Sequence, residues 1–140
     1  MMMTTRNICI TQFDMDRLQE LFAVAEEIGY KSRSDLKQLK EELDRAQVID
    51  PKEAPDNIVT MNSRVRLRDM DDGDIVEYTL VFPADADYDL GRISVMSAVG
   101  TAILGYAVGD VVEWTVPAGA RRLKIEALPY QPEKAGDYHL

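Results

Sequence analysis

The sequence has one cysteine and one histidine in 140 residues. Cys9 has no second cysteine with which to form a disulfide, and no cysteine or histidine lies near it at metal-ligand spacing. His139 is the penultimate residue, where side chains are usually solvated. These absences exclude an internal disulfide framework and a cysteine–histidine zinc site. They also argue against hydrolytic catalysis that depends on a histidine.

Long hydrophobic runs are missing as well. The most apolar stretch, ISVMSAVGTAILGYAVGD at residues 93–110, has Asp110 as its only ionised side chain. Three glycines interrupt it, whereas a membrane-spanning helix needs about 20 predominantly apolar residues. The opening MMMTTRNICITQFD has no secretory pattern, so we expect a cytoplasmic protein without a membrane span. The apolar stretch is expected to supply core residues or a surface that another protein covers.

Positive charge is scarce, with 16 Lys and Arg against 25 Asp and Glu and a net charge of −9. Nonspecific affinity for nucleic acid comes from Lys and Arg side chains that neutralise phosphates. We therefore expect no direct binding to DNA or RNA, and a protein partner instead. The sequence also lacks a GxxxxGK[ST] phosphate loop, and nothing in it predicts a cofactor or a metal site.

Two helices are predicted in the first 50 residues. Between Thr11 and Ile28, and again in SRSDLKQLKEELDRAQVI, apolar residues recur at alternating steps of three and four, which is the heptad pattern of a coiled coil. The first seam consists of Met15, Leu18, Phe22 and Ala25, and the second of Leu36, Leu39, Leu43 and Ala46. Thr11 can cap the start of the first helix, and Gly29 can end it.

Only a few residues separate the two predicted helices, so they are expected to run antiparallel as a short coiled-coil finger that projects roughly 25 Å. The alternative is that both helices lie flat on the second half of the chain as amphipathic cover. Pro51 and Pro55 in DPKEAPDN break regular structure after the second helix. We therefore expect a helical hairpin in residues 1–50 and a second domain in residues 51–140.

The second domain shows the period of β-strands. Val65 and Leu67 alternate with Arg64, Arg66 and Arg68, which predicts one buried and one charged face. The charged face suits either an edge strand in solvent or a binding surface. The acidic turn at 71–74 lacks the remaining ligands of a calcium loop, so a solvated turn is predicted.

The remaining segments complete a small, mainly antiparallel sheet with one short helix, an α+β domain. Strands are expected near 75–82, 93–95, 111–116 and 121–128. Ser97 is the predicted cap of a helix over 98–104, and Gly105 is its predicted end. The core candidates around this helix are Val95, Val99, Ile103 and Leu104.

Several stretches resemble a known family. ISVMSAVGTAILGYAVGDVVEWTVPAG resembles the carboxy-terminal signature of the bacterial Gre transcript-cleavage factors, with a strand, a Ser-x-x-Gly element, a short helix and a Gly-Asp turn. ELDRAQ, VTMNSRVRLR and the ending YQPEKAGDYHL are similar to the Rnk proteins, called regulators of nucleoside diphosphate kinase. Rnk proteins are a Gre-like family with a shortened finger.

The resemblance implies an FKBP-like fold for the second domain, an amino-terminal antiparallel coiled coil, and RNA polymerase as the partner. It further implies a bacterial transcription regulator that docks at the rim of the polymerase secondary channel and competes with Gre factors in transcription elongation. The residues that match the docking part of the Gre signature are Met96, Ser97, Ala98 and Val99. A monomer is favoured.

Gre factors carry a carboxylate pair at the finger tip, which can help to hold a catalytic magnesium ion in the polymerase. The tip of this chain comprises Gly29, Tyr30, Lys31, Arg33 and Asp35 and holds a single carboxylate. Glu26 and Glu27 fall on the flank of the finger. We therefore expect a regulator that is not an enzyme and does not stimulate transcript cleavage.

Three other functions compete with this interpretation. An adaptor for a partner other than RNA polymerase is the main alternative, and a transcript-cleavage elongation factor is a less favoured one. A peptidyl-prolyl isomerase would need an aromatic-lined cleft. One Trp, six Tyr and three Phe show no spacing that would assemble such a cleft, and fold alone does not establish function.

Overall fold

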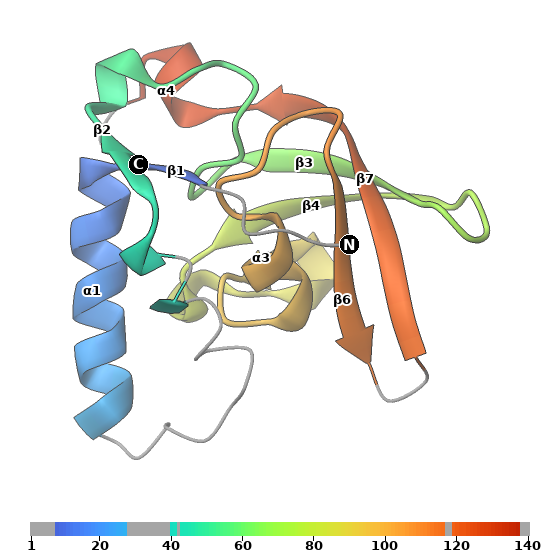
Figure 1. The fold of residues 1–140 in the computed structure, drawn as a ribbon, viewed down its shortest axis with the longest axis horizontal. Coiled ribbons are helices and arrows are strands. Elements are labelled where there is room, and N and C mark those ends of the chain that lie inside the picture. The colour runs from blue at the N-terminus through green and yellow to red at the C-terminus, as the bar shows by residue number, and fades with distance from the viewer. Residues whose placement is uncertain (1–7, 28–39, 42, 117–118, 138–140) are drawn as a thin grey trace.

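A computed structural model describes residues 8–27, 40–41, 43–116 and 119–137, and it combines helices with two sheets (Figure 1). The helices are α1 (Gln12–Glu27), α3 (Ala98–Ile103) and α4 (Pro132–Ala135). The strands are β1 (Cys9–Thr11), β2 (Gln47–Ile49), β3 (Arg64–Asp69), β4 (Ile75–Val81), β5 (Arg92–Ser94), β6 (Val111–Val116) and β7 (Gly119–Tyr130). Short 3₁₀ turns lie at Pro51–Glu53, Pro83–Asp85 and Tyr88–Leu90.

The larger sheet has five strands in the order β5-β4-β3-β7-β6. All its neighbouring strands are antiparallel except β4 and β5, which are parallel. The predicted strands are all present, and the alternation in β3 is confirmed because Val65 and Leu67 are fully buried. The edge-strand interpretation of the three arginines is wrong, because β3 pairs with both β4 and β7 and lies in the middle of the sheet.

The turn between β3 and β4 is held by its own polar groups. The carboxylate of Asp69 accepts the backbone N–H of Asp71 at 2.8 Å, and it also pairs with Arg121 from β7. Gly73 adopts a left-handed φ of 80°. The acidic turn is therefore a hydrogen-bonded hairpin connection, as predicted.

The pair β1 and β2 was not predicted. These strands are parallel, with Cys9 opposite Gln47 and Thr11 opposite Ile49. The prediction that the second helix continues to residue 49 is wrong, since Ala46 is not helical and residues 47–49 are a strand. The N–H of Gln47 donates to the carbonyl of Ile8 at 2.9 Å, so pairing with a distant segment overrides the local heptad pattern.

Helix α1 begins where the sequence predicts, because Oγ1 of Thr11 accepts the N–H of Asp14 at 3.1 Å. Its seam residues Met15, Leu18 and Phe22 are buried in one hydrophobic cluster with Leu43 and with residues of the larger sheet. Figure 1 shows α1 along the side of the molecule opposite to β6 and β7. The described seam therefore packs within the same core as the sheet.

Part of the predicted hairpin cannot be compared with the structure. The finger-tip residues Gly29, Tyr30, Lys31, Arg33 and Asp35 lie outside the described residues, as does the predicted turn that they form. The coiled-coil hairpin, the FKBP-like description and the division at residue 50 stay predictions.

The core lies between the larger sheet and the elements that cover its inner face. Val95, Ile103 and Leu104 are buried in the same cluster as Leu67 and Ile125, which confirms three of the four predicted core residues around α3. The fourth, Val99, is half-buried and packs against this cluster. None of the helices in the described ranges is long and apolar enough to cross a membrane.

Candidate functional site

The connection from β5 into α3 is built by serine side chains. Oγ of Ser97 accepts the N–H of Gly100 at 3.1 Å and donates to the carbonyl of Ser94 at 2.7 Å. Oγ of Ser94 accepts the N–H of Met96 at 3.0 Å. Serine is a favoured N-cap because its oxygen satisfies an N–H that lacks a partner in the first turn. The predicted cap is confirmed, and its geometry is tied to the end of β5.

Glycines at both ends of α3 allow the chain to pass close to its neighbours. A Cβ on Gly100 would lie 2.2 Å from the carbonyl oxygen of Ser94, so only glycine fits there without a shift. Gly105 follows the helix with a φ of 83°, and a Cβ there would lie 2.7 Å from the Cβ of Ile8. Gly105 therefore ends the helix as predicted and also brings it against the segment that leads into β1.

The four predicted docking residues differ in exposure. Met96 is 8% exposed and belongs to the core, so it is not part of a surface. Ser97 and Val99 are half-buried. Ala98 begins α3, but its side chain lies outside the description. Among the four, Ser97 and Val99 are therefore the residues whose described side chains stay partly exposed at this end of α3.

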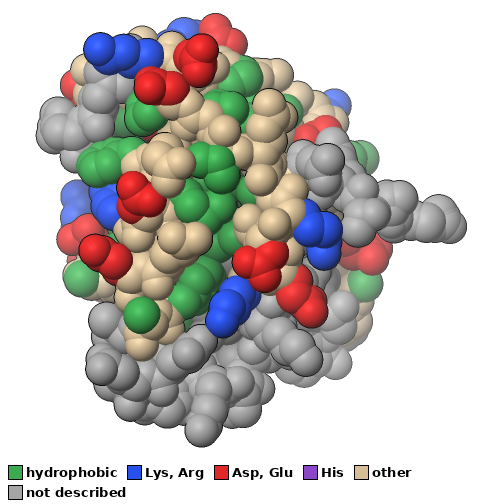
Figure 2. Space-filling view, turned by 60° about the vertical axis from the view of Figure 1, so that its left-hand side comes forward, with side chains coloured by type: hydrophobic (Ala, Val, Ile, Leu, Met, Phe, Trp, Pro, Cys, Tyr) green, Lys and Arg blue, Asp and Glu red, His purple; other side chains and the backbone are tan. Residues whose placement is uncertain are grey.

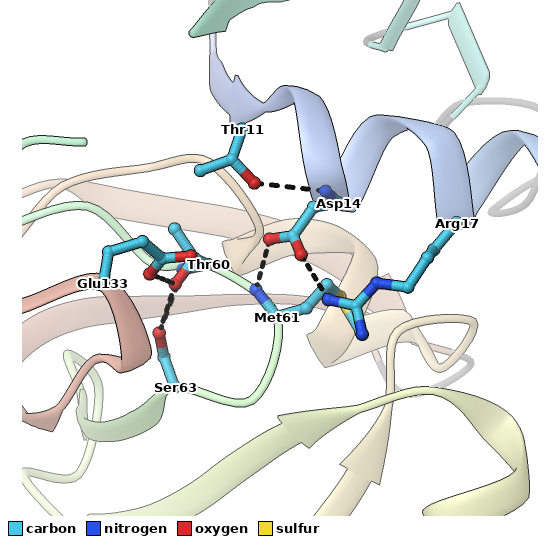
Figure 3. A network of polar contacts seen from close by, with 7 residues as sticks. All are labelled: Thr11, Asp14, Arg17, Thr60, Met61, Ser63 and Glu133. Atoms are coloured by element: carbon cyan, nitrogen blue, oxygen red, sulfur yellow. Dashed lines mark hydrogen bonds and ion pairs between the residues drawn. The ribbon is translucent and has the colours of Figure 1, made fainter. Parts of the chain in front are cut away.

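A second polar site joins α1 to the segment that precedes β3 (Figure 3). Oδ2 of Asp14 accepts the backbone N–H of Met61 at 3.0 Å, and Oδ1 pairs with Arg17 at 2.6 Å. Burial raises the pKa of Asp14 to about 6, although both hydrogen bonds oppose this shift and the charge of Glu133 adds to it. The carboxylate of Asp14 therefore loses solvation free energy where α1 meets the segment before β3.

The same segment is also tied to the carboxy-terminal residues. Oγ1 of Thr60 donates to Glu133 at 2.7 Å and lies 2.9 Å from Oγ of Ser63. Nε2 of Gln131 donates to the carbonyl of Ile58 at 2.7 Å. Backbone and side-chain polar groups of residues 58–63 therefore bond to α1 and to the start of α4. Figure 3 shows these contacts for Asp14 and Glu133.

Sequence reasoning did not find this junction. From the sequence, Asp14 is only an acid in the first turn of a predicted helix, where it suits the helix dipole, and its partner Met61 is 47 positions away. One feature of the sequence does point to these residues. VTMNSR and YQPEKAG belong to the stretches that resemble Rnk proteins, and they contain Thr60, Ser63, Gln131 and Glu133. No local pattern indicates that these two stretches meet.

A shallow groove of about 230 Å³ lies between α1 and residues 40–44. Its lining combines apolar side chains of the seam with polar ones, namely Met15, Gln19, Phe22, Ala23, Lys40, Leu43 and Asp44. Figure 2, which turns the α1 side towards the viewer, shows hydrophobic side chains in a strip between polar and charged ones. The groove therefore borders the heptad seam, whose residues Met15, Phe22 and Leu43 are themselves buried.

Comparison with known proteins relates the two halves to two family models. Residues 6–49 match the model described as the Rnk N-terminus. Residues 54–130 match the model described as transcription elongation factor, GreA/GreB, C-term. The match to the second model includes the five-stranded sheet, the capped helix α3 and the turn that follows it.

Individual relatives carry the names of the same two families. The chain is 42% identical over 139 residues to the regulator of nucleoside diphosphate kinase of Escherichia coli (strain K12), which covers 99% of the chain and 100% of that protein. It is 39% identical over 113 residues to transcription elongation factor GreA of Chlorobium phaeobacteroides, covering 80% of the chain and 70% of that factor.

A solved structure of a prokaryotic transcription elongation factor GreA/GreB from Nitrosomonas europaea superposes with a TM-score of 0.73 at 38% identity. It covers 89% of this chain and 100% of that one. The fold and the sequence thus support the same relationship. The chain belongs to the Rnk family of regulators of nucleoside diphosphate kinase, and its carboxy-terminal part relates it to the transcription elongation factors GreA and GreB.

Proposed function

We propose that the protein is a non-enzymatic transcription regulator that binds RNA polymerase at the rim of the secondary channel. It competes there with Gre-type factors and does not stimulate transcript cleavage. The observation that carries this proposal is the match of residues 54–130 to the carboxy-terminal part of GreA and GreB. The resemblance to Gre factors implies that this part docks on the polymerase.

The contact surface is proposed at the amino-terminal end of α3. Ser97 and Val99 are half-buried, so each still offers part of its side chain to a partner. The serine cap and Gly100 fix the backbone of this end against Ser94. A surface that is already ordered loses little conformational entropy when it binds, which favours affinity.

The absence of cleavage activity is proposed from the sequence of the finger tip. IGYKSRSD at residues 28–35 contains one carboxylate, Asp35, beside Lys31 and Arg33. One carboxylate is a poor ligand set for a magnesium ion, and neighbouring cations weaken it further. The protein therefore occupies the channel without supplying the groups that activate water.

Competition for core RNA polymerase tests the proposal. Fluorescently labelled protein is titrated with core enzyme, and unlabelled GreA is then added. Binding should be saturable and reversed by GreA. Ser97→Asp keeps an oxygen for the helix cap but places a charge on the surface, so its affinity should fall roughly tenfold or more. Ser97→Thr, which keeps the hydroxyl, should bind nearly as the wild type does.

Circular dichroism must show that both variants remain folded. Absence of binding at micromolar concentrations, or binding that GreA does not displace, would contradict the proposal. Such a result would favour an adaptor with another partner.

A further inference from the structure

The side of the larger sheet that faces away from α3 carries an excess of positive charge. Strand pairing places Arg64, Arg66, Arg68, Arg92, Arg122 and Lys124 on this side, which we call the outer sheet face. The carboxylates on the same face are Glu77, Glu113 and Glu126. Among the described residues, six cations and three carboxylates lie on this face, and Asp71 of the neighbouring turn pairs with Arg122, so the face keeps a net positive charge within a chain of net charge −9.

The positive charge of the outer sheet face contrasts with the negative net charge of the whole chain. An antiparallel sheet often leaves one face in water, and charge of either sign keeps such a face soluble. In a chain with 25 acidic and 16 basic residues, solubility alone would be served by carboxylates. The concentration of guanidinium groups on this face therefore indicates a role in recognition.

The cations are of two kinds. Arg66 pairs with Glu77 at 2.9 Å and Arg68 pairs with Glu126 at 3.2 Å, so these guanidinium groups are held by neighbouring strands. Arg122 pairs with Asp71 of the β3–β4 turn at 3.5 Å. Arg64, Arg92 and Lys124 form no ion pair within the described part of the chain. The paired arginines are ordered and the other three cations are available, which suits the binding of an anionic partner.

Apolar side chains flank the cations. Register places Ile75, Arg68, Lys124 and Val111 in one row across β4, β3, β7 and β6. The two ends of this row are apolar and exposed, with Ile75 at 51% and Val111 at 44%. Arginine beside apolar contact area is typical of the residues that dominate protein–protein binding.

We propose that the outer sheet face is a docking surface for an acidic segment of a partner protein. Carboxylates of that segment contact Arg64, Arg92 and Lys124, and its apolar side chains contact Ile75 and Val111. A nucleic acid fits less well, because a phosphate backbone offers no apolar partner for Ile75 and Val111. Ile103 and Leu104 pack on the opposite, inner side of the sheet, so this surface is separate from the α3 contact and independent of the polymerase proposal.

Titration with a 20-residue poly-glutamate peptide, followed by amide chemical shifts at low salt, tests the proposal. A chain of net charge −9 repels this peptide unless a local cationic surface binds it. Shifts should concentrate in β3, β5 and β7. Arg64→Glu combined with Lys124→Glu should weaken binding roughly tenfold or more.

The matched control combines Arg45→Glu with Lys134→Glu, which makes the same change in net charge at exposed positions away from the sheet. This control should weaken binding much less than the first double variant, because it leaves the proposed contact cations in place. At 0.15 M salt, where charges more than about 8 Å apart are largely screened, its effect should fall below about twofold. No shifts at millimolar peptide, or equal weakening in both double variants, would overturn the proposal. Tighter binding of a dT20 oligonucleotide than of poly-glutamate would also overturn it.

Discussion

The backbone N–H of Met61 donates a 3.0 Å hydrogen bond to the carboxylate of Asp14, although 47 positions separate the two residues. Asp14 lies in the first turn of α1, and Met61 lies just before β3. Both residues are buried. This bond ties the first turn of α1 to the segment before β3, so a buried carboxylate joins two distant parts of the chain.

Asp14 should make the stability of the protein depend on pH. Its pKa is about 6 in the folded protein against the ordinary value of 3.8, so the folded state binds more protons between these values. The free energy of unfolding contributed by this group is therefore greatest below pH 3.8 and falls as pH rises through 6. The shift corresponds to a loss of about 3 kcal/mol.

Urea denaturation of wild type and Asp14→Asn at several pH values measures this effect. The difference between the two unfolding free energies removes the contribution of carboxylates that do not interact with Asp14, and it retains the coupling between Asp14 and Glu133. It should change by about 2 kcal/mol between pH 4 and pH 7, because pH 4 already lies slightly above the ordinary pKa of 3.8, with the variant gaining relative to wild type as pH rises. A difference that stays constant over this range would show that burial does not shift the pKa of Asp14.

Gly105 and Gly136 allow the cost of a left-handed backbone to be measured separately from the cost of a steric clash. Gly105 has a φ of 83° and Gly136 has a φ of 82°, but only at Gly105 would a Cβ meet another atom, the Cβ of Ile8 at 2.7 Å. Gly136→Ala should cost about 1 kcal/mol for the left-handed conformation. Gly105→Ala should cost about 1–3 kcal/mol more, because it also overpacks the core.

Thermal or urea denaturation of the two glycine variants gives this comparison directly. Equal losses of stability would show that Ile8 can shift away from a Cβ at position 105 with little loss of folding free energy. The close approach of α3 to the start of the chain would then be unimportant for folding.

The cap of α3 should contribute measurably to stability. Ser97→Ala removes the oxygen that accepts the N–H of Gly100, and loss of such a cap typically costs about 1 kcal/mol. Ser97→Thr retains the hydroxyl and should keep most of this stability. Urea denaturation of both variants distinguishes them, and an alanine variant as stable as the threonine variant would refute the cap.

Features with a local signal could be predicted from the sequence. The alternation of Val65 and Leu67 with arginines predicts a strand buried on one side, and Ser97 with Gly105 predicts both ends of a short helix. Each of these signals arises from residues within a few positions of one another. The structure agrees with all of them.

Features that depend on distant contacts could not be predicted. The pairing of Cys9 with Gln47 joins segments that each resemble helix or loop when considered alone. The central position of β3 depends on β7, which lies more than 50 residues later. For the candidate site, Met96 falls in the core because the chain turns inward after β5, and no local pattern distinguishes it from its neighbour Ser97.

The most direct test of the proposed function is transcript cleavage in backtracked RNA polymerase complexes, measured with this protein alone and in combination with GreA. We predict no cleavage above the intrinsic rate with the protein alone, and progressive inhibition of GreA-stimulated cleavage as its concentration rises. Stimulation of cleavage by the protein alone would contradict the interpretation of the finger tip. Unchanged GreA activity at saturating protein would contradict competition at the secondary channel.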